Sequence, residues 1–309
     1  MSAAGMAFID GRFCPIGEAK ISVLDWGLLR SDATYDVVHV WKGRFFRLDD
    51  HLARFRRSVA SLRMTLPFAE DRLRAMLAEL VARSGLRDAY VEMACTRGEP
   101  APGSRDPRLC RNRFFAFAVP FVWIVPPERQ EAGVDAVIAR SVHRIPPASV
   151  DPTVKNYHWL DFTRGLFEAY DRGAETAILT DGTGAIAEGP GFNVFAVRGG
   201  AVTTPESGVL EGITRRTVLE LCDAIGTPVA LTRVSVEELL TADELFLSST
   251  AGGIMPVRSL DGRPVGDGRP GAITRTLRRL YWEKKEAGWH GTAVPYDAFS
   301  ACGADQSDL

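Results

Sequence analysis

Residues 151–159 read DPTVKNYHW, and the interpretation of both fold and function starts from the lysine in this stretch, Lys155. A lysine at an arbitrary position is most often a solvated surface charge. Lys155 instead follows a proline-rich turn and stands among apolar and aromatic residues. Removal from water lowers the pKa of a lysine, and an amine must be neutral to attack a carbonyl carbon. The stretch therefore predicts a lysine that forms a Schiff base.

A candidate phosphate-binding turn lies downstream, in the segment GVLEGITRR at residues 208–216. A glycine turn that opens a helix directs backbone N–H groups and the Thr214 hydroxyl at an anion, although a threonine that only caps the helix gives the same pattern. The hydroxyl run 248–250 precedes the turn 251–253 and is expected to complete the phosphate site. Arg54 offers a forked guanidinium that matches a phosphate.

The third feature is Glu188, in the segment GAIAEGPGFN at residues 184–193. A carboxylate opposite a pyridine nitrogen keeps that nitrogen protonated, and the protonated ring is an electron sink. A glutamate in a surface turn fits the same letters. The lysine, the phosphate-binding turn and the carboxylate together predict a phosphorylated aldehyde cofactor, pyridoxal 5′-phosphate (PLP).

Size and charge limit the other classes of function. The chain has 309 residues, which is enough for two domains or one large domain. The formal net charge of −2 argues against a broad electrostatic grip on nucleic acid or an anionic membrane. The N-terminal segment MSAAGMAFIDGRF is unlike a secretory signal, and no apolar run of about 18 residues is present to span a membrane.

The cysteines and histidines indicate neither disulfides nor a metal site. The five cysteines are scattered, and no C-x-x-C pair occurs. A disulfide framework or a zinc site is therefore not expected, and a reducing, cytoplasmic location is. The five histidines, among them His51 and His143, show no metal-ligand spacing and are expected in core, surface or capping positions.

Periodicity and turn residues predict an α/β chain of two domains. We expect an N-terminal α/β domain over residues 1–123, a linker over 124–130 and a C-terminal domain over 131–309. Helices are expected from Asp49 as N-cap to Leu62 and at 71–83, 160–172, 214–225 and 273–286. A hairpin is expected at 8–13, a loop at 97–113, and strands at 34–41, 89–96, 114–122, 134–142, 176–179, 193–197 and 201–203. Pro120 predicts an edge strand or a bulge.

The chain resembles the fold-type IV PLP enzymes, which include branched-chain aminotransferases, D-amino-acid aminotransferases and aminodeoxychorismate lyases. Five segments carry the resemblance, in family order: FFRLDDHLARF, DPTVKNYHW, DGTGAIAEGPGFNVF, GVLEGITRRTVLEL and ADELFLSSTAGGIMPVRSLDG. The resemblance implies a smaller N-terminal domain, a larger C-terminal PLP-binding domain, the cofactor at their interface, and a homodimer.

Within this group, the segments SDATYDVVHVWKGRFFRLDDHL and STAGGIMPV are most similar to the (R)-selective amine transaminases. That subgroup implies ping-pong transfer of an amino group from a chiral primary amine to a keto acid, with pyruvate as the expected acceptor. The expected partners are thus a small-molecule amine donor and a keto-acid acceptor, with neither nucleic acid nor membrane.

The resemblance also assigns residues by motif, with Lys155 as the catalytic Schiff-base lysine and proton shuttle. The implied cofactor contacts are Arg54, Lys155, Glu188, Phe192, Asn193, Leu210, Gly212, Ile213, Thr214, Ser249 and Thr250. The implied substrate contacts are Tyr35, Val37, Tyr90, Glu92, Arg105, Trp159 and Ala251. Among these, Arg105 aligns with a mobile arginine expected to meet the carboxylate of pyruvate.

The sequence departs from the pattern close to the expected substrate pocket. Arg30 stands where similar enzymes often carry histidine, Tyr157-His158 replaces a more usual pair, and Leu160 stands where branched-chain enzymes often place tyrosine. These changes bear on the substrate range and not on the cofactor. The alternatives are therefore a branched-chain or D-amino-acid aminotransferase, an aminodeoxychorismate lyase, and a non-catalytic PLP-binding protein.

Overall fold

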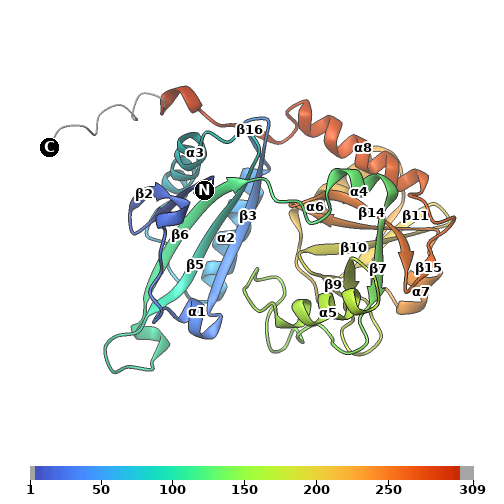
Figure 1. The fold of residues 1–309 in the computed structure, drawn as a ribbon, viewed down its shortest axis with the longest axis horizontal. Coiled ribbons are helices and arrows are strands. Elements are labelled where there is room, and N and C mark those ends of the chain that lie inside the picture. Colours follow the sequence, from blue (N-terminus) through green and yellow to red (C-terminus); the bar gives the residue numbers. More distant parts are fainter. Residues whose placement is uncertain (1–3, 300–309) are drawn as a thin grey trace. The chain divides into compact units, whose positions relative to one another are not determined.

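A computed structural model describes residues 4–299, which form two compact units. The first unit contains the described residues up to 122 together with 154–157 and those from 285 onward (Figure 1). The second unit contains residues 123–153 and 158–284. The division expected from the sequence was contiguous and kept residues 154–157 and 285–299 with the C-terminal domain.

A seven-stranded antiparallel sheet forms the first unit, in the order β16-β4-β3-β5-β6-β1-β2. Its strands are β1 (Met6–Ile9), β2 (Arg12–Pro15), β3 (Ala33–Trp41), β4 (Arg44–Phe46), β5 (Ala89–Glu99), β6 (Arg111–Pro120) and β16 (Gly291–Ala293). The expected hairpin turns at Asp10-Gly11, where both residues adopt positive φ. The strand at the β4 edge, β16, comes from the far end of the chain.

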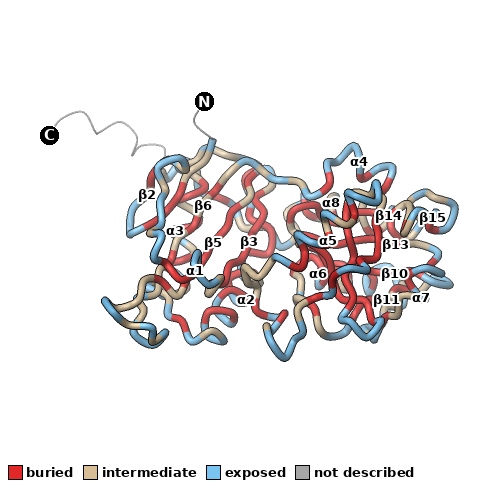
Figure 2. Tube along the Cα trace, turned by 60° about the horizontal axis from the view of Figure 1, so that its bottom comes forward, coloured by how far each residue is buried: buried red, intermediate tan, exposed pale blue. Residues whose placement is uncertain are grey.

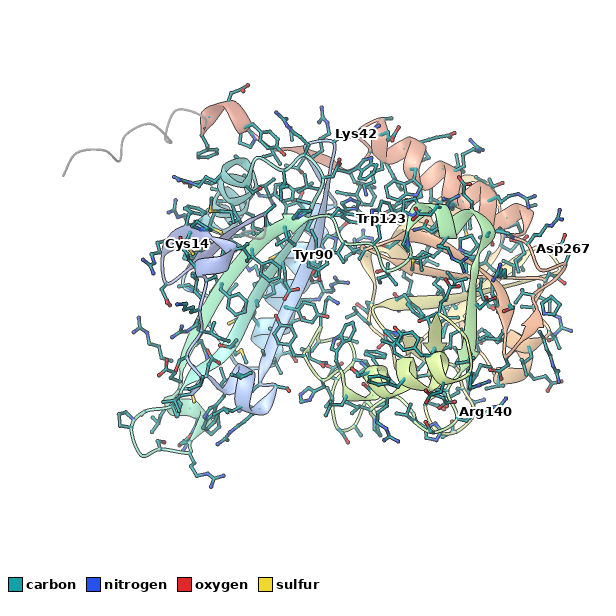
Figure 3. The ribbon with its side chains drawn as sticks, viewed as in Figure 1. Cys14, Lys42, Tyr90, Trp123, Arg140 and Asp267 are labelled. Carbon is teal, nitrogen blue, oxygen red and sulfur yellow. The ribbon has the colours of Figure 1, made fainter. Side chains whose placement is uncertain are left out.

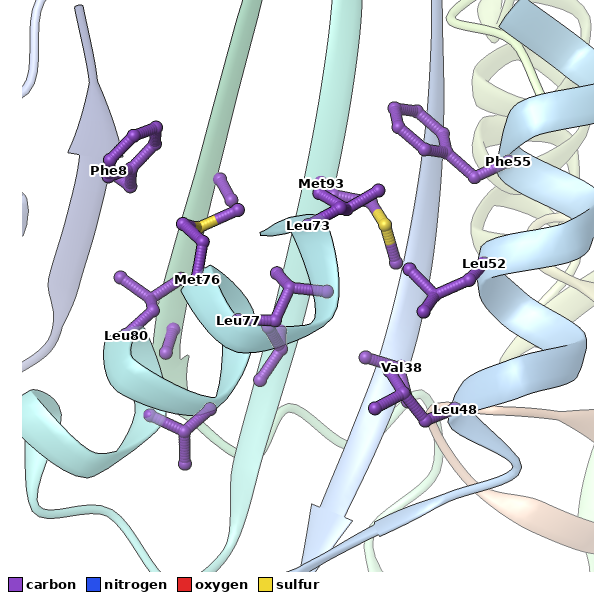
Figure 4. Close-up of a cluster of buried hydrophobic side chains, with 14 of the residues drawn as sticks. Phe8, Val38, Leu48, Leu52, Phe55, Leu73, Met76, Leu77, Leu80 and Met93 are labelled. Atoms are coloured by element: carbon purple, nitrogen blue, oxygen red, sulfur yellow. The ribbon is translucent and has the colours of Figure 1, made fainter. Parts of the chain in front are cut away.

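The helices α2 (Leu48–Ser61) and α3 (Glu70–Ser84) cover one face of this sheet. Figure 4 shows the apolar side chains of both helices directed at the strands. The period of three and four residues that predicted α2 explains the packing, because Leu52, Phe55 and Val59 lie on one side of the helix and are buried. The remaining helical turns of the unit are α1 (Trp26–Arg30), η1 (Ile16–Glu18), η2 (Pro107–Leu109) and η3 (Tyr296–Ala298).

Strand β3 separates the helix-covered core from a second apolar cluster. Val38 and Val40 belong to the core beneath α2 and α3, whereas Tyr35 and Val37 pack with Ala94 in the other cluster. Successive side chains of a strand point to opposite faces, which accounts for this alternation. The residues implied as substrate contacts on β3 therefore lie on the face away from the helices.

A nine-stranded mixed sheet forms the second unit, with the path β12-β11-β10-β13-β14-β7-β8, while β15 pairs with β14 and β9 pairs with β10. Pairs β11–β12, β14–β7 and β7–β8 are parallel, and the other pairs are antiparallel. The strands are β7 (Val134–Ile138), β8 (Thr176–Ile178), β9 (Glu188–Gly189), β10 (Phe192–Arg198), β11 (Ala201–Pro205), β12 (Val229–Thr232), β13 (Glu244–Ser249), β14 (Gly253–Leu260) and β15 (Arg263–Pro264). Strands β10, β13 and β14 are almost wholly buried (Figure 2).

The helices that belong to this half of the chain are α4 (Pro127–Ala132), α5 (Leu160–Asp171), α6 (Ile213–Ala224), α7 (Val236–Leu240) and α8 (Ala272–Glu286). The last two residues of α8 belong to the first unit. Helix α6 packs on β13, and α5 packs on β8. The long helices fall where the sequence predicted them, because their apolar spacing is local and strong.

Three local expectations differ from the structure. Asp49 is not the N-cap of α2; Arg47 precedes the helix with a φ of 56°, and Asp49 lies in the first turn, where its charge favours the helix dipole. Pro120 marks neither an edge nor a bulge, since β6 lies between β5 and β1 and Pro120 is its last residue. The expected linker 124–130 contains the start of α4, with Pro127 in its first turn.

Membrane, metal and disulfide features can be stated for the described residues. No helix within residues 4–299 is long and apolar enough to cross a membrane. No group of three or more His, Cys, Asp or Glu side chains in that range is arranged to hold a metal ion. Cys14, Cys95, Cys110 and Cys222 are free thiols, and Cys302 lies outside the described residues.

Candidate functional site

The residues singled out by the sequence fall into two main groups. The lysine group lies in the first unit and consists of Lys155, Tyr35, Tyr157, Glu92 and Tyr90. The carboxylate group lies in the second unit and consists of Glu188, Arg144, Asp161, Leu210 and Asn193.

The backbone of Lys155 is fixed to strand β3. Its carbonyl oxygen accepts hydrogen bonds from the Tyr35 N–H at 3.0 Å and from Thr34 Oγ1 at 2.7 Å. Thr34 also pairs with Asn156 in an isolated antiparallel bridge. Residues 154–157 therefore lie along β3, and this pairing places them in the first unit.

The side chain of Lys155 is half-buried and uses an uncharged partner. Its Nζ donates a hydrogen bond of 3.2 Å to Tyr35 Oη and lies 4.3 Å from the centre of the Tyr35 ring. Among the described residues no carboxylate forms an ion pair with Lys155. The Lys155 amine is therefore held by a phenol and not by a salt bridge.

A carboxyl among tyrosines completes the lysine group. Glu92 Oε1 accepts a hydrogen bond of 2.6 Å from Tyr157 Oη, and Glu92 Oε2 accepts one of 3.1 Å from Tyr90 Oη (Tyr90 is labelled in Figure 3). Tyr157 also stacks on Tyr35, with ring centres 4.6 Å apart. Burial raises the pKa of Glu92, and the two phenol hydrogen bonds offset part of that rise. Glu92 therefore binds a proton more readily than an exposed glutamate.

Arg54 makes a forked ion pair that sequence reasoning missed. Its Nε and Nη2 donate to Asp36 Oδ2 and Oδ1, each at 2.8 Å, and His51 Nδ1 lies 2.8 Å from Asp36 Oδ1. Burial of Asp36 opposes its charge, but Arg54 and His51 outweigh burial and hold the pKa of Asp36 below its usual value. A charged residue at a core-facing position of β3 was the available signal. The phosphate contact assigned to Arg54 stays a prediction.

Glu188 lies in a buried trio of charged side chains. Arg144 Nε donates to Glu188 Oε1 at 3.0 Å, and Arg144 Nη1 donates to Asp161 Oδ2 at 2.6 Å. All three residues are less than 10% exposed. Glu188 is therefore not a surface-turn residue. The sequence analysis did not single out Arg144 or Asp161. The available signal was that each charged residue stands next to apolar residues in the sequence, Ile145 after Arg144 and Leu160 and Phe162 around Asp161.

The backbone of Leu210 is held by two side chains from a single hairpin. Glu188 Oε2 accepts a hydrogen bond from the Leu210 N–H at 3.0 Å, and Asn193 Nδ2 donates to the Leu210 carbonyl at 2.9 Å. Glu188 and Asn193 face each other across β9 and β10. Gly212 follows closely, and a Cβ at this position would lie 2.1 Å from Asn193 Oδ1. Only glycine fits there without a shift.

Helix α6 begins directly after this turn, with Gly212 as its N-cap. Thr214 is thus not the capping residue; it lies in the first turn and is buried. The first N–H groups of an α-helix have no partner within the helix and attract anions. Arg215 Nη2 donates to the Pro205 carbonyl at 2.8 Å, while its buried Nε has no hydrogen-bond partner among the described residues.

These features fit the predicted cofactor. Glu188 accepts hydrogen bonds from Arg144 and from the Leu210 N–H, and a carboxylate fixed in this way suits a ring N–H. The start of α6 suits a phosphate, since the close approach at Gly212 excludes a side chain. The role of Lys155 as the Schiff-base amine stays a prediction.

The other expected site residues occupy different positions. Ser249 Oγ donates to the Gly191 carbonyl at 2.7 Å and accepts from the Ala251 N–H at 3.2 Å, so this hydroxyl ties two turns together. Trp159 packs edge-to-face against Phe162 in the second unit. Phe192, Ile213 and Ala251 are buried, and Thr250 is half-buried in the turn after β13.

Arg105 lies in the loop between β5 and β6, and its side chain is exposed. Its neighbour Asp106 caps η2 and forms an ion pair of 2.6 Å with Arg108. Of the residues that depart from the family pattern, Arg30 stacks on Trp26, with its guanidinium carbon 3.3 Å from the ring centre. Arg105 therefore projects from a loop whose other charges pair with each other.

Comparison with known proteins places the chain in one family. Residues 33–260 match the model of the family described as amino-transferase class IV. A Methanocaldococcus jannaschii protein, provisionally named a branched-chain-amino-acid aminotransferase, is 34% identical over 277 residues, which cover 89% of this chain and 94% of the relative. The D-alanine aminotransferase of Bacillus licheniformis is 30% identical over 271 residues, covering 87% of this chain and 93% of that protein.

Solved structures give the same result for the fold. The branched-chain aminotransferase of Thermoproteus uzoniensis with norvaline superposes with a TM-score of 0.84 at 30% identity, covering 94% of this chain and 99% of that chain. The branched-chain amino acid aminotransferase of Thermobaculum terrenum, solved in its PLP form, gives a TM-score of 0.83 at 28% identity, covering 95% and 99% of the two chains. The chain therefore belongs to the amino-transferase class IV family and is a PLP-dependent aminotransferase of fold type IV.

Proposed function

We propose that this aminotransferase moves the amino group of an amino acid to a 2-keto acid, with branched-chain amino acids or D-alanine as the donor class. The observation that carries the proposal is the similarity to branched-chain and D-alanine aminotransferases along almost the whole chain, including the segments of both residue groups. From the sequence alone, an amino-acid aminotransferase was the alternative to an (R)-selective amine transaminase, and the relatives favour the amino-acid aminotransferase.

The bound cofactor supplies an electron sink through its protonated pyridine ring. Lys155 Nζ would take the proton from the substrate carbon that bears the amino group and would pass it to the carbon of the cofactor that receives the amino group, while Tyr35 Oη orients the Lys155 amine. Glu188 holds the proton on the ring nitrogen. The N–H groups at the start of α6, with Thr214, receive the phosphate.

The proposed donor class can be tested without steady-state assays. Purified holoenzyme is mixed with single donors in the absence of any acceptor, and the absorption of the bound cofactor is followed. The donors are L-leucine, L-valine, D-alanine and both enantiomers of 1-phenylethylamine. Loss of absorption with an amino acid supports the proposal. Loss with the (R)-amine alone contradicts it.

A second candidate is the (R)-selective amine:pyruvate transaminase implied by the sequence segments. The observation that favours it is the carboxyl of Glu92, which lies with three tyrosines around Lys155. An acidic side chain offers no positive charge to the carboxylate of an amino-acid donor, whereas an apolar amine carries no carboxylate. Val37 adds an apolar wall on the same face of β3. In the donor test, this candidate requires loss of absorption with (R)-1-phenylethylamine.

Arg105 is proposed to meet the carboxylate of the keto acid. Its exposed position in the loop between β5 and β6 allows it to approach or leave a substrate. The substitution Arg105→Ala is expected to reduce the rate with pyruvate far more than the rate of the amine half-reaction. Equal losses in both half-reactions would exclude this role. Arg108 is a matched control, because it lies in the same loop but pairs with Asp106.

The remaining assignments of cofactor and substrate contacts are also proposals, as are a homodimeric assembly and a cytoplasmic location. The free thiols of the four described cysteines are consistent with a reducing compartment. Light scattering of the purified holoenzyme tests the dimer directly, since a dimer has twice the mass of the 33.8 kDa chain.

A further inference from the structure

The buried trio of Arg144, Glu188 and Asp161 carries one positive and two negative formal charges. Buried carboxylates are retained when a cation and hydrogen bonds compensate for the lost water. Within the trio, Arg144 is the only cation, and its guanidinium contacts both carboxylates. The trio therefore has an excess of one negative charge, which suits a protonated ring nitrogen at Glu188.

Arg144 is held from several directions. Its N–H donates to the Thr180 carbonyl at 2.8 Å, and its guanidinium carbon lies 4.1 Å from the centre of the Phe162 ring. Asp161 is fixed as well, because it accepts hydrogen bonds from the N–H groups of Ile145 at 3.0 Å and Phe162 at 2.8 Å. With these contacts in place, the Nε–H of Arg144 points at Glu188 Oε1.

The second oxygen of Glu188 connects the trio to the phosphate-binding turn. Glu188 Oε2 accepts from the Leu210 N–H, and Asn193 holds the carbonyl of the same residue. Gly212 and the start of α6 follow closely in the chain. A change in the orientation of Glu188 would thus be transmitted to the turn that opens α6.

We propose that Arg144 is a positioning residue for the cofactor: it fixes the Glu188 carboxylate as an anion in one orientation and, through Leu210, fixes the turn before α6. This inference rests on the proposed role of Glu188 at the ring nitrogen. A guanidinium stays protonated across the working pH range, so its effect on Glu188 is constant. The charged groups that act on Glu188 include Arg144 itself and, through it, Asp161 from α5.

The test uses the variants Arg144→Met, Arg144→Lys, Glu188→Gln and the double variant R144M/E188Q. Arg140→Met is the matched control, because Arg140 lies in the same segment but forms an exposed ion pair with Asp261. Three quantities are measured: the dissociation constant of PLP from the apoprotein, the pH dependence of the cofactor absorption, and the thermal unfolding of the apoprotein. Arg144→Lys keeps the charge and covers the case in which Arg144→Met does not fold.

Loss of the charged hydrogen bond from Arg144 to Glu188 in Arg144→Met is expected to weaken PLP binding at least about tenfold and to shift the pH midpoint of the absorption. Arg144→Lys is expected to fall between wild type and Arg144→Met, because one ammonium cannot reproduce both directed contacts. If Arg144 acts through Glu188, the double variant R144M/E188Q should bind PLP no more weakly than Glu188→Gln alone. Arg140→Met is expected to match the wild type.

Three results would overturn the inference, and they distinguish a failure at Arg144 from a failure at Glu188. If Glu188→Gln weakens PLP binding and shifts the pH midpoint while both folded Arg144 variants match the wild type, Arg144 has no positioning role and Glu188 keeps its own. The same conclusion follows if the effects of Arg144→Met and Glu188→Gln are additive. If Glu188→Gln itself leaves both quantities unchanged, the proposed role of Glu188 fails and the inference fails with it.

Discussion

The lysine group and the carboxylate group hold their functional residues in opposite ways. Lys155 is half-buried and contacts a phenol, with no ion pair among the described residues, whereas Glu188 is buried and contacts a guanidinium and a backbone N–H. The first arrangement leaves an amine able to react. The second leaves a carboxylate unable to move. The contrast predicts that substitutions in the first group change activity and that those in the second change stability and cofactor binding.

The largest expected effect is that of Lys155→Ala on turnover. Because Lys155 is proposed both to react with the cofactor and to move the proton, the rate should fall by more than about 10⁴-fold, the upper end of an acid–base contribution alone. The free energy of unfolding should change by less than about 1 kcal/mol, since no ion pair is lost. Single-turnover kinetics and urea unfolding measure the two effects. A large loss of stability in this variant would remove the contrast between the groups.

Asp161→Asn is expected to show the reverse pattern in the carboxylate group. It removes one partner of the buried ion pair with Arg144, which should cost about 3 kcal/mol of unfolding free energy. Asp171→Asn is the matched control, because Asp171 ends the same helix in an exposed position. Urea unfolding of both variants gives the comparison. Similar midpoints for the two variants would show that the buried pair contributes nothing to stability.

Gly212→Ala tests how tightly the turn before α6 is packed. The added Cβ would meet Asn193 Oδ1, and overpacking of this kind typically costs about 2 kcal/mol. Gly17→Ala serves as the control, since a Cβ there meets no atom within 4 Å and the residue is not in a positive-φ conformation. We expect loss of stability and weaker PLP binding in Gly212→Ala only, measured by thermal unfolding and cofactor titration. Equal stability and equal PLP binding of the two variants would show that the turn before α6 can accommodate a Cβ at position 212.

Glu92→Gln is expected to change the pH dependence of stability by a smaller amount. The pKa of Glu92 is raised above 4.5 in the folded chain, mainly by burial, so the native state keeps a proton that the unfolded chain has lost. The stability of the wild type should therefore fall as pH rises from about 4.5 through the folded pKa, by about 1.4 kcal/mol for each unit of pKa shift. Glutamine removes this fall. Parallel stability curves for the two proteins between pH 4 and 8 would contradict the assignment.

Local patterns were sufficient for most of the fold. The spacing of Leu52, Phe55 and Val59 predicted α2, and the β-branched run at 34–41 predicted β3 within one residue. Both signals depend on neighbours in the sequence, which is why they could be read directly. The capping position of α2 was wrong because a positive φ at Arg47 has no sequence signature in that residue type.

The charged partners could not be predicted in the same way. Arg54 and Asp36 are 18 residues apart, and Arg144 and Glu188 are 44 residues apart. Such pairs form only when two elements pack, so no local spacing reports them. Likewise, the DPTVKNYHW segment predicted a reactive lysine but not the two hydrogen bonds that attach its carbonyl to β3. The sequence therefore predicts candidate active residues, but it does not predict the residues that hold them.

The strand β16 has a consequence for synthesis on the ribosome. Strand β4 is translated early in the first unit, but its edge partner β16 is translated only after α8. Until then β4 presents an unpaired backbone edge, which is a site for aggregation or for chaperone binding. A gene product truncated before residue 291 would keep that edge exposed. The position of β16 thus makes completion of the first unit depend on translation beyond the whole of the second unit.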